Sequence, residues 1–246
     1  MSFPPSPPPL PDVRRVLAVF AHPDDIDFGA AGTVARWVDE GIEVAYLLVT
    51  RGEAGGFDET PRTEMPAIRE AEQRAAAAAV GVSQVQFLDG YADGAIYVTH
   101  QLRRDIARTI RHWRPERVLT NSPLRRWDSL GGPNHPDHAA VGEATCDAVY
   151  PDARNPYAHP ELLADEGLEP WSVGEVWFTG GPDPDHYMDI TETFDRKWAA
   201  LRSHVSQLPD PDAVERALRH GFGRNARTAG FGEGRLAESF TIMKAG

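Results

Sequence analysis

The feature that most constrains the fold is a short apolar run that ends at a histidine and a proline. Residues Val16-Leu-Ala-Val-Phe-Ala21 include no polar position, and His22-Pro23 follows at once. An unbroken apolar run of this length is typical of a strand covered by helices on both faces, which is the pattern of a parallel sheet. Proline cannot continue a central strand, so this strand must end where the polar residues begin. We therefore expect an α/β protein.

Similar runs recur along the chain and alternate with segments of helical pattern. The further expected strands are 42–50, 85–88 and 117–120. The expected helices are a stretch that ends at Glu40 before Gly41, then 66–80 before Gly81, 99–112 and 139–149. This order predicts a Rossmann-like, doubly wound, mostly parallel sheet with helices on both faces. Beyond it we expect a long excursion over 151–170, an edge strand over 175–178 and a closing helix over 195–207.

Composition and charge narrow the class of protein. The 246 residues suit one soluble domain, so we expect a Pro-rich tail over 1–12 and a single domain over 13–246. The net charge of −12 argues against binding to nucleic acid or to an anionic membrane surface. The single cysteine, Cys146, excludes an internal disulfide and favours a reducing cytoplasm. No stretch resembles a signal peptide, and no apolar run is long enough for a membrane span.

Polar clusters follow three of the expected strands. They are His22-Pro-Asp-Asp25, Arg51-Gly-Glu-Ala-Gly-Gly56 and Asn134-His-Pro-Asp-His138. Ligands of open α/β sheets bind beyond the carboxyl ends of the strands, where these clusters should lie. We therefore expect the two clusters rich in His and Asp to converge at one edge of the sheet.

The two converging loops hold the ligand types of a catalytic zinc ion. Such an ion takes three nitrogen or oxygen ligands and keeps a position open for water, and His22, Asp25 and His138 supply that set. Asp24, next to a ligand but itself spare, suits the base that accepts a proton from the metal-bound water. Fe²⁺ and Co²⁺ are alternatives to Zn²⁺, because two histidines and one carboxylate accept several divalent ions.

Each of these residues has a simpler interpretation when it is taken alone. An aspartate after a strand often caps the next helix. His135 and His138 would also fit a turn followed by the first turn of a helix. The expected convergence of both loops at one sheet edge is what favours the metal site.

Four motifs resemble those of the PIG-L/LmbE-like deacetylase family. Residues 21–29 resemble its AHPDD motif, and 134–138 resemble its downstream HPDH signature. Residues 50–55 resemble its T-x-G-E-x-G loop, and 68–82 its R-x-x-E helix leading to L-G-V. The resemblance runs over roughly 16–149 and is weak beyond. It implies the same three metal ligands and the same base as above.

The resemblance also implies roles for residues that spacing alone does not assign. His135 matches the group that polarises the carbonyl or protonates the leaving amine, and Asp137 matches the partner that orients this histidine. Arg69 and Glu53 match positions near the substrate sugar. The glutamate that follows the two aspartates in many members is replaced by Ile26-Asp27, so Asp27 is expected to stand in for it on the substrate side with a shorter carboxylate.

By this resemblance the chain is expected to be a zinc-dependent N-deacetylase. Members of the family remove an acyl group, usually acetyl, from an amino-sugar conjugate such as a mycothiol, bacillithiol or glycosylphosphatidylinositol precursor or a glycopeptide antibiotic. The expected partner is therefore a small amino-sugar conjugate, and a homo-oligomer is left open. The alternatives are a hydrolase of a non-sugar amide or ester on the same fold, and a non-catalytic ligand-binding relative.

Overall fold

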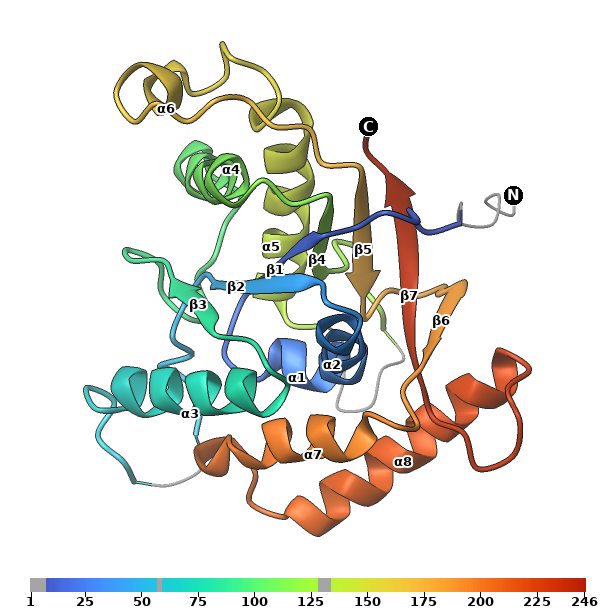
Figure 1. Cartoon of the computed structure of the whole chain (residues 1–246). Helices are drawn as coiled ribbons and strands as arrows, with labels where there is room; N and C mark the ends of the chain where they lie inside the picture. Colours follow the sequence, from blue (N-terminus) through green and yellow to red (C-terminus); the bar gives the residue numbers. More distant parts are fainter. Residues whose placement is uncertain (1–7, 57–58, 128–133) are drawn as a thin grey trace.

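One mixed sheet with helices on both of its faces organises the chain (Figure 1). This computed structural model describes residues 8–56, 59–127 and 134–246. Residues 1–7 of the expected Pro-rich tail, and residues 128–133 of the loop before Asn134, lie outside the described residues.

Five of the strands are parallel. They are β1 (Arg15–Phe20), β2 (Glu43–Leu48), β3 (Gln84–Phe87), β4 (Arg117–Asn121) and β5 (Glu175–Thr179). Their order in space is β3-β2-β1-β4-β5, so the chain reverses its direction across the sheet between β3 and β4. This arrangement confirms the predicted doubly wound fold. It also makes β1 and β4 neighbours at the switch point, where ligands bind in such sheets.

The strand expected at the edge over 175–178 is instead an inner strand, and the prediction of an edge was wrong. β7 (Ala237–Lys244) pairs antiparallel with β5, and β6 (His186–Asp189) pairs antiparallel with β7. All five residues of β5 are accordingly buried. The last part of the chain therefore adds two antiparallel strands to the sheet beyond β5.

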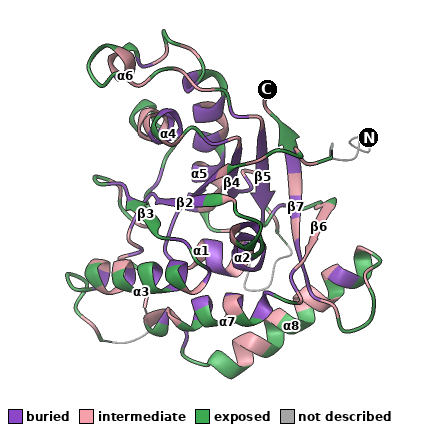
Figure 2. Cartoon of the chain, in the orientation of Figure 1, coloured by how far each residue is buried: buried purple, intermediate pink, exposed green. Residues whose placement is uncertain are grey.

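Two separate cores cover the two faces of the sheet. Val16, Ala18 and Phe20 of β1 pack into one core, and Leu17 and Val19 pack into the other. The first face carries α1 (Asp25–Gly29), α2 (Ala31–Asp39), α3 (Met65–Ala79) and α7 (Phe194–Arg202). The second carries α4 (His100–Trp113) and α5 (Pro136–Asp147), with α6 (Pro160–Ala164) beyond them. The central strands β1, β4 and β5 are almost wholly buried, as Figure 2 shows.

The C-terminal third differs most from expectation. The expected helix over 195–207 is α7 followed by a 3-10 turn, Val205–Gln207, and the helix itself ends at Arg202. α8 (Pro211–Thr228) was not expected; it lies against β7 and buries only Ala226. Within the described ranges, no helix combines the length and the apolar character that a membrane span requires.

Candidate metal centre and active site

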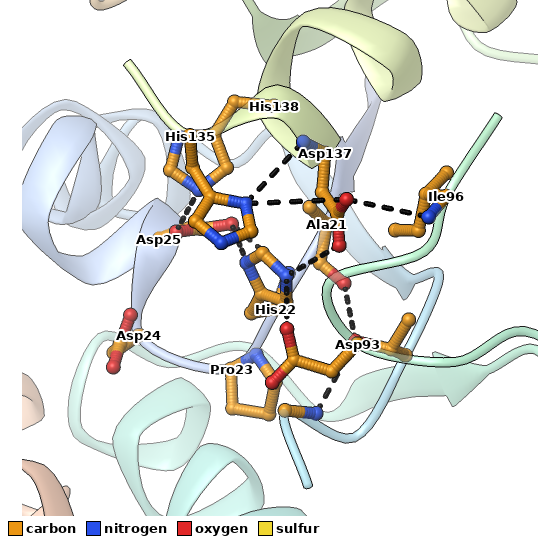
Figure 3. A network of polar contacts seen from close by, with 12 residues as sticks. Ala21, His22, Pro23, Asp24, Asp25, Asp93, Ile96, His135, Asp137 and His138 are labelled. Carbon is orange, nitrogen blue, oxygen red and sulfur yellow. Dashed lines mark hydrogen bonds and ion pairs between the residues drawn. The ribbon is translucent and has the colours of Figure 1, made fainter. Parts of the chain in front are cut away.

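The polar clusters that follow β1 and β4 meet at the carboxyl ends of these two strands (Figure 3). His22 comes two residues after the end of β1, and Asp25 opens α1. His135 is the N-cap residue of α5, so His138 lies in the first turn of that helix. The loop after β3 brings a further carboxylate, Asp93, against His22. Three segments that are distant in sequence therefore build one polar site.

The residues expected as metal ligands place their donor atoms close together. Asp25 Oδ2 lies 3.3 Å from His22 Nδ1, and Asp25 Oδ1 lies 2.9 Å from His138 Nε2. Ligands of a tetrahedral zinc ion sit at about 2.0–2.2 Å from the metal, which puts neighbouring donor atoms about 3.3–3.6 Å apart. The contact of Asp25 with His22 has this spacing, whereas its contact with His138 is shorter and uses the other carboxylate oxygen. Two imidazoles and one carboxylate are ligand types that such an ion takes.

Among the described residues, two groups have donor atoms mutually close enough to hold a metal ion; both include His22, and neither includes Asp25. Donor atoms of His22, His135 and His138 lie within 4.8 Å of one another, as do those of His22, Asp93 and Asp137. In the second group the carboxylates contact Nε2 of His22, at 3.0 Å for Asp93 and 3.2 Å for Asp137. Nε2 is thus used as a donor to carboxylates, and Nδ1 is the nitrogen left to face Asp25 and a cation.

The site is electrostatically suited to positive charge. Burial lowers the pKa of His22, but the charge of Asp25 and the hydrogen bonds to Asp137 and Asp93 outweigh burial and raise it. Burial raises the pKa of Asp25, but His138 and His22 outweigh this effect and hold it well below its usual range. Carboxylates that stabilise an imidazolium in this way would equally stabilise a divalent cation.

Asp24 lies beside this cluster and is held by Arg69. Arg69 Nη2 donates hydrogen bonds to Asp24 Oδ2 at 2.8 Å and to the carbonyl oxygen of Pro23 at 2.7 Å. Burial and the charge of Asp25 raise the pKa of Asp24, although Arg69 acts in the opposite direction. A carboxylate with a raised pKa is a stronger base, which suits the role expected of Asp24.

Arg69 reaches Asp24 by passing over Gly52, and only glycine fits there. Arg69 Nη1 donates to the carbonyl oxygen of Gly52 at 2.7 Å. A Cβ atom at this position would lie 2.0 Å from Nη1, and the φ of +65° is one that other residues rarely adopt. The position of the Arg69 side chain therefore requires a glycine at position 52, in the loop after β2.

A cavity of about 240 Å³ opens beside these groups. Its walls come from the loops that follow β1, β2 and β3, from α3 and from the N-cap of α5: His22, Asp24, Ala54, Gly55, Arg69, Asp93 and His135. Potential ligand, base, cationic and imidazole groups thus face one space that is large enough for a small polar group.

His135 and Asp137 are in contact, but the contact is made by the backbone of Asp137 and not by the carboxylate that was expected to orient His135. The backbone N–H of Asp137 donates to His135 Nδ1 at 3.3 Å, whereas the Asp137 carboxylate is 4.0 Å from that nitrogen. The carboxylate accepts instead from His22 and from the N–H groups of Gly94 and Ile96. Because Nδ1 accepts a hydrogen bond, the proton of a neutral His135 is on Nε2.

The structure places two of the expected substrate residues away from the cavity. Glu53 accepts a hydrogen bond from the backbone N–H of Asp93 at 2.8 Å, which connects the loop after β2 to the loop after β3. Asp27 is fully buried and contacts His204 at 2.8 Å and Gln73 at 2.9 Å. A carboxylate enclosed in this way cannot touch a substrate, which corrects the expected position of Asp27. Arg69 is the one of the three that lines the cavity.

The sequence does not predict Asp93, which lines the cavity, or Gln73 and His204, which lie behind it. Asp93 lies in the sequence Tyr91-Ala-Asp-Gly94, just beyond the carboxyl end of β3. An Asp-Gly pair there would have signalled a turn at the same sheet edge as the other clusters. Gln73 follows Arg69 by one helical turn, and that spacing was the available signal for it. His204 carried no recognisable signal.

A model of the PIG-L family, described as GlcNAc-PI de-N-acetylase, matches residues 17–149. The chain belongs to the PIG-L family. Diacetylchitobiose deacetylase of Thermococcus kodakarensis is 34% identical to this chain over 203 residues, which cover 82% of the chain and 73% of that relative. A probable N-acetyl-α-D-glucosaminyl L-malate deacetylase 2 of Bacillus anthracis is 30% identical, over 79% of the chain and 82% of that relative.

Solved structures extend the family likeness to the C-terminal third. N,N′-diacetylchitobiose deacetylase of Pyrococcus horikoshii, complexed with an inhibitor, superimposes with a TM-score of 0.86 and 30% identity. The superposition covers 95% of this chain and 85% of that one. The part of the chain beyond residue 149, where sequence motifs are weak, therefore keeps the family's architecture.

Proposed function

We propose that this member of the PIG-L family is a zinc-dependent N-deacetylase that acts on a conjugate of N-acetylglucosamine. The observation that carries the proposal is the placement of Asp24, held by Arg69 in a cavity beside the His22, Asp25 and His138 cluster. The similar proteins named above are deacetylases of chitobiose and of a glucosaminyl malate conjugate, which supports an amino-sugar substrate.

His22, Asp25 and His138 would hold the metal ion. When bound, a divalent cation supplies a Lewis acid and lowers the pKa of a coordinated water from 15.7 to about 7. Zinc suits the two imidazoles and one carboxylate, and Fe²⁺ or Co²⁺ are alternatives that depend on availability. The contacts of His22 Nε2 with Asp93 and Asp137 would fix the orientation of this ligand.

Asp24 is assigned to proton transfer. Its carboxylate accepts a proton from the attacking water, whose oxygen forms a bond to the amide carbon. The protonated Asp24 then gives that proton to the nitrogen as the C–N bond breaks, which releases acetate and the free amine. Arg69 keeps the carboxylate oriented during both transfers through its contact at 2.8 Å.

His135 is assigned to the carbonyl oxygen. Burial and the charge of His22 lower the pKa of His135, so the ring is neutral near pH 7. Its Nδ1 accepts from the backbone of Asp137, and Nε2–H is free to donate to the oxygen that becomes negative. This assignment selects polarisation of the carbonyl over protonation of the amine.

The C-terminal third belongs to the same functional unit in this proposal. Lys197 of α7 donates to the carbonyl oxygens of Asp27 and Phe28 at 2.7 and 2.8 Å, and His204 contacts Asp27. Both contacts reach α1, the helix that begins at the ligand Asp25. We therefore propose residues 13–246 as one catalytic domain.

Amine release from a panel of acetylated compounds tests the proposed function. The purified protein, loaded with Zn²⁺, Fe²⁺ or Co²⁺ in turn, is given N-acetylglucosamine, N,N′-diacetylchitobiose and N-acetylglucosaminyl malate. N-acetylated amino acids and an acetate ester represent non-sugar substrates. We expect release from a sugar conjugate and its loss after chelation. Preference for the amino acid or ester would overturn the sugar assignment, and equal turnover after chelation would overturn the metal assignment.

The Asp24→Asn variant tests the mechanism within the same assay. Loss of general base catalysis typically costs about 10²- to 10⁴-fold in rate, and we expect kcat to fall by that amount with the metal content unchanged. Asp39→Asn is the control, because Asp39 is an exposed carboxylate at the end of α2. Unchanged turnover in Asp24→Asn would exclude this residue as the base.

A further inference from the structure

A buried chain of hydrogen bonds connects the backbone of Asp24 to the C-terminal third of the protein. The backbone N–H of Asp24 donates to Gln73 Oε1 at 2.9 Å, and Gln73 Nε2 donates to Asp27 Oδ2 at 2.9 Å. His204 Nε2 contacts the same oxygen of Asp27 at 2.8 Å. Gln73, Asp27 and His204 are all fully buried. None of the three lines the cavity that contains Asp24.

Asp24 needs such support because its backbone conformation is unfavourable. Its φ is 81° and its ψ −28°, in the left-handed region that a residue with a Cβ atom rarely adopts. Residues in such sparsely populated regions are strained and persist only where the surroundings enforce them. Arg69 holds the carboxylate and Gln73 holds the N–H, so both ends of the residue are fixed from α3.

The order of these hydrogen bonds follows from which atoms of each side chain can donate and which can accept. The Gln73 side chain accepts from Asp24 with its oxygen, so its amide nitrogen must find an acceptor inside the protein, and Asp27 supplies it. Oδ1 of Asp27 has no hydrogen-bond partner among the described residues. The two contacts to Oδ2, from Gln73 and His204, therefore fix the orientation of this carboxylate.

His204 is held in place independently of Asp24. It follows α7 and precedes the turn Val205–Gln207, where the backbone N–H and the Oγ of Ser206 donate to Glu72 of α3 at 2.8 and 2.7 Å. Lys197 anchors the preceding helix to the carbonyl oxygens at the end of α1. The C-terminal segment thus forms a fixed support for Asp27.

We propose that Gln73 and His204 are positioning residues for the Asp24 carboxylate: Gln73 acts directly on the backbone of Asp24, and His204 acts through Asp27 and Gln73. The proposal rests on the proposed function, in which Asp24 is the base. A displaced base should slow the chemical step while substrate binding in the cavity is retained, because neither residue touches that cavity. The structure thereby assigns Asp27, and a histidine far along the chain, a role behind the site rather than in contact with substrate.

Three variants test the proposal: two remove hydrogen bonds, and the third restores a donor at position 204. Gln73→Met and His204→Leu remove the hydrogen bonds with little change of volume. His204→Gln keeps a nitrogen donor near the position of Nε2. A misplacement of about 1 Å can cost about 100-fold in rate. We therefore expect kcat to fall about 10- to 100-fold in the first two variants, with KM within about 2-fold and metal content unchanged, and His204→Gln to recover most of the loss.

Arg196→Met is the matched control, since it removes hydrogen bonds from α7 to the carbonyl oxygens of Ala79 and Val80 at the end of α3, which take no part in the support of Asp24. A merely structural role predicts that Arg196→Met lowers kcat as much as His204→Leu does for the same loss of thermal stability. It also predicts that His204→Gln brings no recovery. Either result would overturn the proposal.

A readout that is independent of activity separates this proposal from the proposed function. Hydrogen exchange at the Asp24 amide, followed by NMR, reports on its bond to Gln73. We expect the amide to be protected in the wild-type protein and to lose protection in Gln73→Met, with core amides of β1 unaffected. If the wild-type protein cleaves no amide, the function fails while this measurement still decides the hydrogen bond. If Gln73→Met exchanges like the wild type, the positioning role is excluded.

Discussion

His22 and Asp93 are in direct contact: Nε2 of the imidazole lies 3.0 Å from Oδ1 of the carboxylate, and each side chain is only 8% exposed. The two residues come from the ends of different strands, β1 and β3. A metal-binding histidine usually donates its other ring N–H to a carboxylate, which fixes its tautomer and raises its basicity. Asp93 has this relation to His22, and its Oδ2 is in turn held by the backbone N–H of Ala54 at 3.0 Å.

Replacing Asp93 should therefore weaken the site without removing a ligand. Loss of such a supporting carboxylate typically costs about 10- to 100-fold in metal affinity or activity. We expect Asp93→Ala to show a loss of this size in a competition titration with a chelator. Asp89→Ala is the control, because that carboxylate lies in the same loop but is 88% exposed. Wild-type metal affinity and activity in Asp93→Ala would contradict the role given to this pair.

Arg69 should be irreplaceable by lysine. Its guanidinium donates to Asp24, Pro23 and Gly52 at once, a fork that a single ammonium group cannot reproduce. Removing one partner of a desolvated charge pair costs several kcal/mol, so we expect Arg69→Lys and Arg69→Met both to lower kcat by at least about 10-fold. Steady-state kinetics and metal analysis would check this, and a fully active Arg69→Lys would contradict it.

Gly52→Ala should reproduce the Arg69 defect. A Cβ atom at Gly52 would lie 2.0 Å from Arg69 Nη1 and force the guanidinium away from Asp24. Gly90→Ala is a matched control, because Gly90 has a similarly positive φ of 85° but nothing lies within 4 Å of the added atom. We expect Gly90→Ala to lose some thermal stability and keep its kcat, whereas Gly52→Ala loses kcat. Equal kcat in the two variants would exclude the clash as the cause.

The sequence predicted the fold class because the evidence for it is local. β1 and β2 lie in continuous apolar runs, which end at the polar residues His22 and Thr50. The convergence of the 22–25 and 134–138 loops followed from the rule that parallel strands end at one edge, and the structure brings these loops together.

The C-terminal strands escaped prediction for a physical reason. β7 has a core-facing side and a half-exposed side, with Phe240 and Ile242 buried between less buried neighbours. Alternation of this kind is the signal of an antiparallel strand, whereas the continuous runs elsewhere in the chain indicate parallel strands. The prediction of β5 as an edge strand failed because the partner on its outer side, β7, was not recognised.

The supports of the site escaped prediction because they are defined only by the folded structure. Gln73 and His204 are far apart in the sequence, and each would pass for an ordinary helix or turn residue. Only their shared contact with Asp27 Oδ2 gives them a function. Motif resemblance led to the opposite expectation for Asp27, a position near substrate, because a motif carries no information on which side of the helix is buried.

The pair formed by Lys197 and Glu238 should be needed for stability. Both side chains are 0% exposed, with Nζ 2.8 Å from Oε1, and Glu238 also accepts from the N–H groups of Gly32 and Thr33. Breaking a buried pair on one side leaves an uncompensated charge and costs about 3–5 kcal/mol. We expect Lys197→Met to lower the free energy of unfolding by this amount in urea titrations.

Two comparisons give this prediction its control. Lys197→Met combined with Glu238→Gln should recover part of the loss, because no unpaired buried charge remains. Arg36→Ala breaks an exposed pair with Glu40, in which the side chains are 45% and 49% exposed, and should cost under about 1 kcal/mol. A loss in Lys197→Met no larger than that in Arg36→Ala would contradict the buried-pair argument.

Glu175 should make part of the stability dependent on acid pH. Burial raises the pKa of this carboxyl, but hydrogen bonds from Lys244 and Arg117 outweigh burial and hold the pKa below its usual value of 4.5. When the pKa of a carboxyl is lower in the folded than in the unfolded protein, its ionised form stabilises the fold at any pH above the unfolded-state pKa. This contribution disappears as the pH falls through the folded-state pKa.

Urea unfolding of the wild type and of Glu175→Gln from pH 7 to pH 3 would measure this contribution. We expect Glu175→Gln to be less stable by about 3–5 kcal/mol at pH 7, because Arg117 loses its buried partner, and the gap to narrow below about pH 4.5, near the ordinary pKa of glutamate. A gap that stays constant down to pH 3 would show that the pKa of this carboxyl is the same in the folded and unfolded protein, and would contradict the prediction.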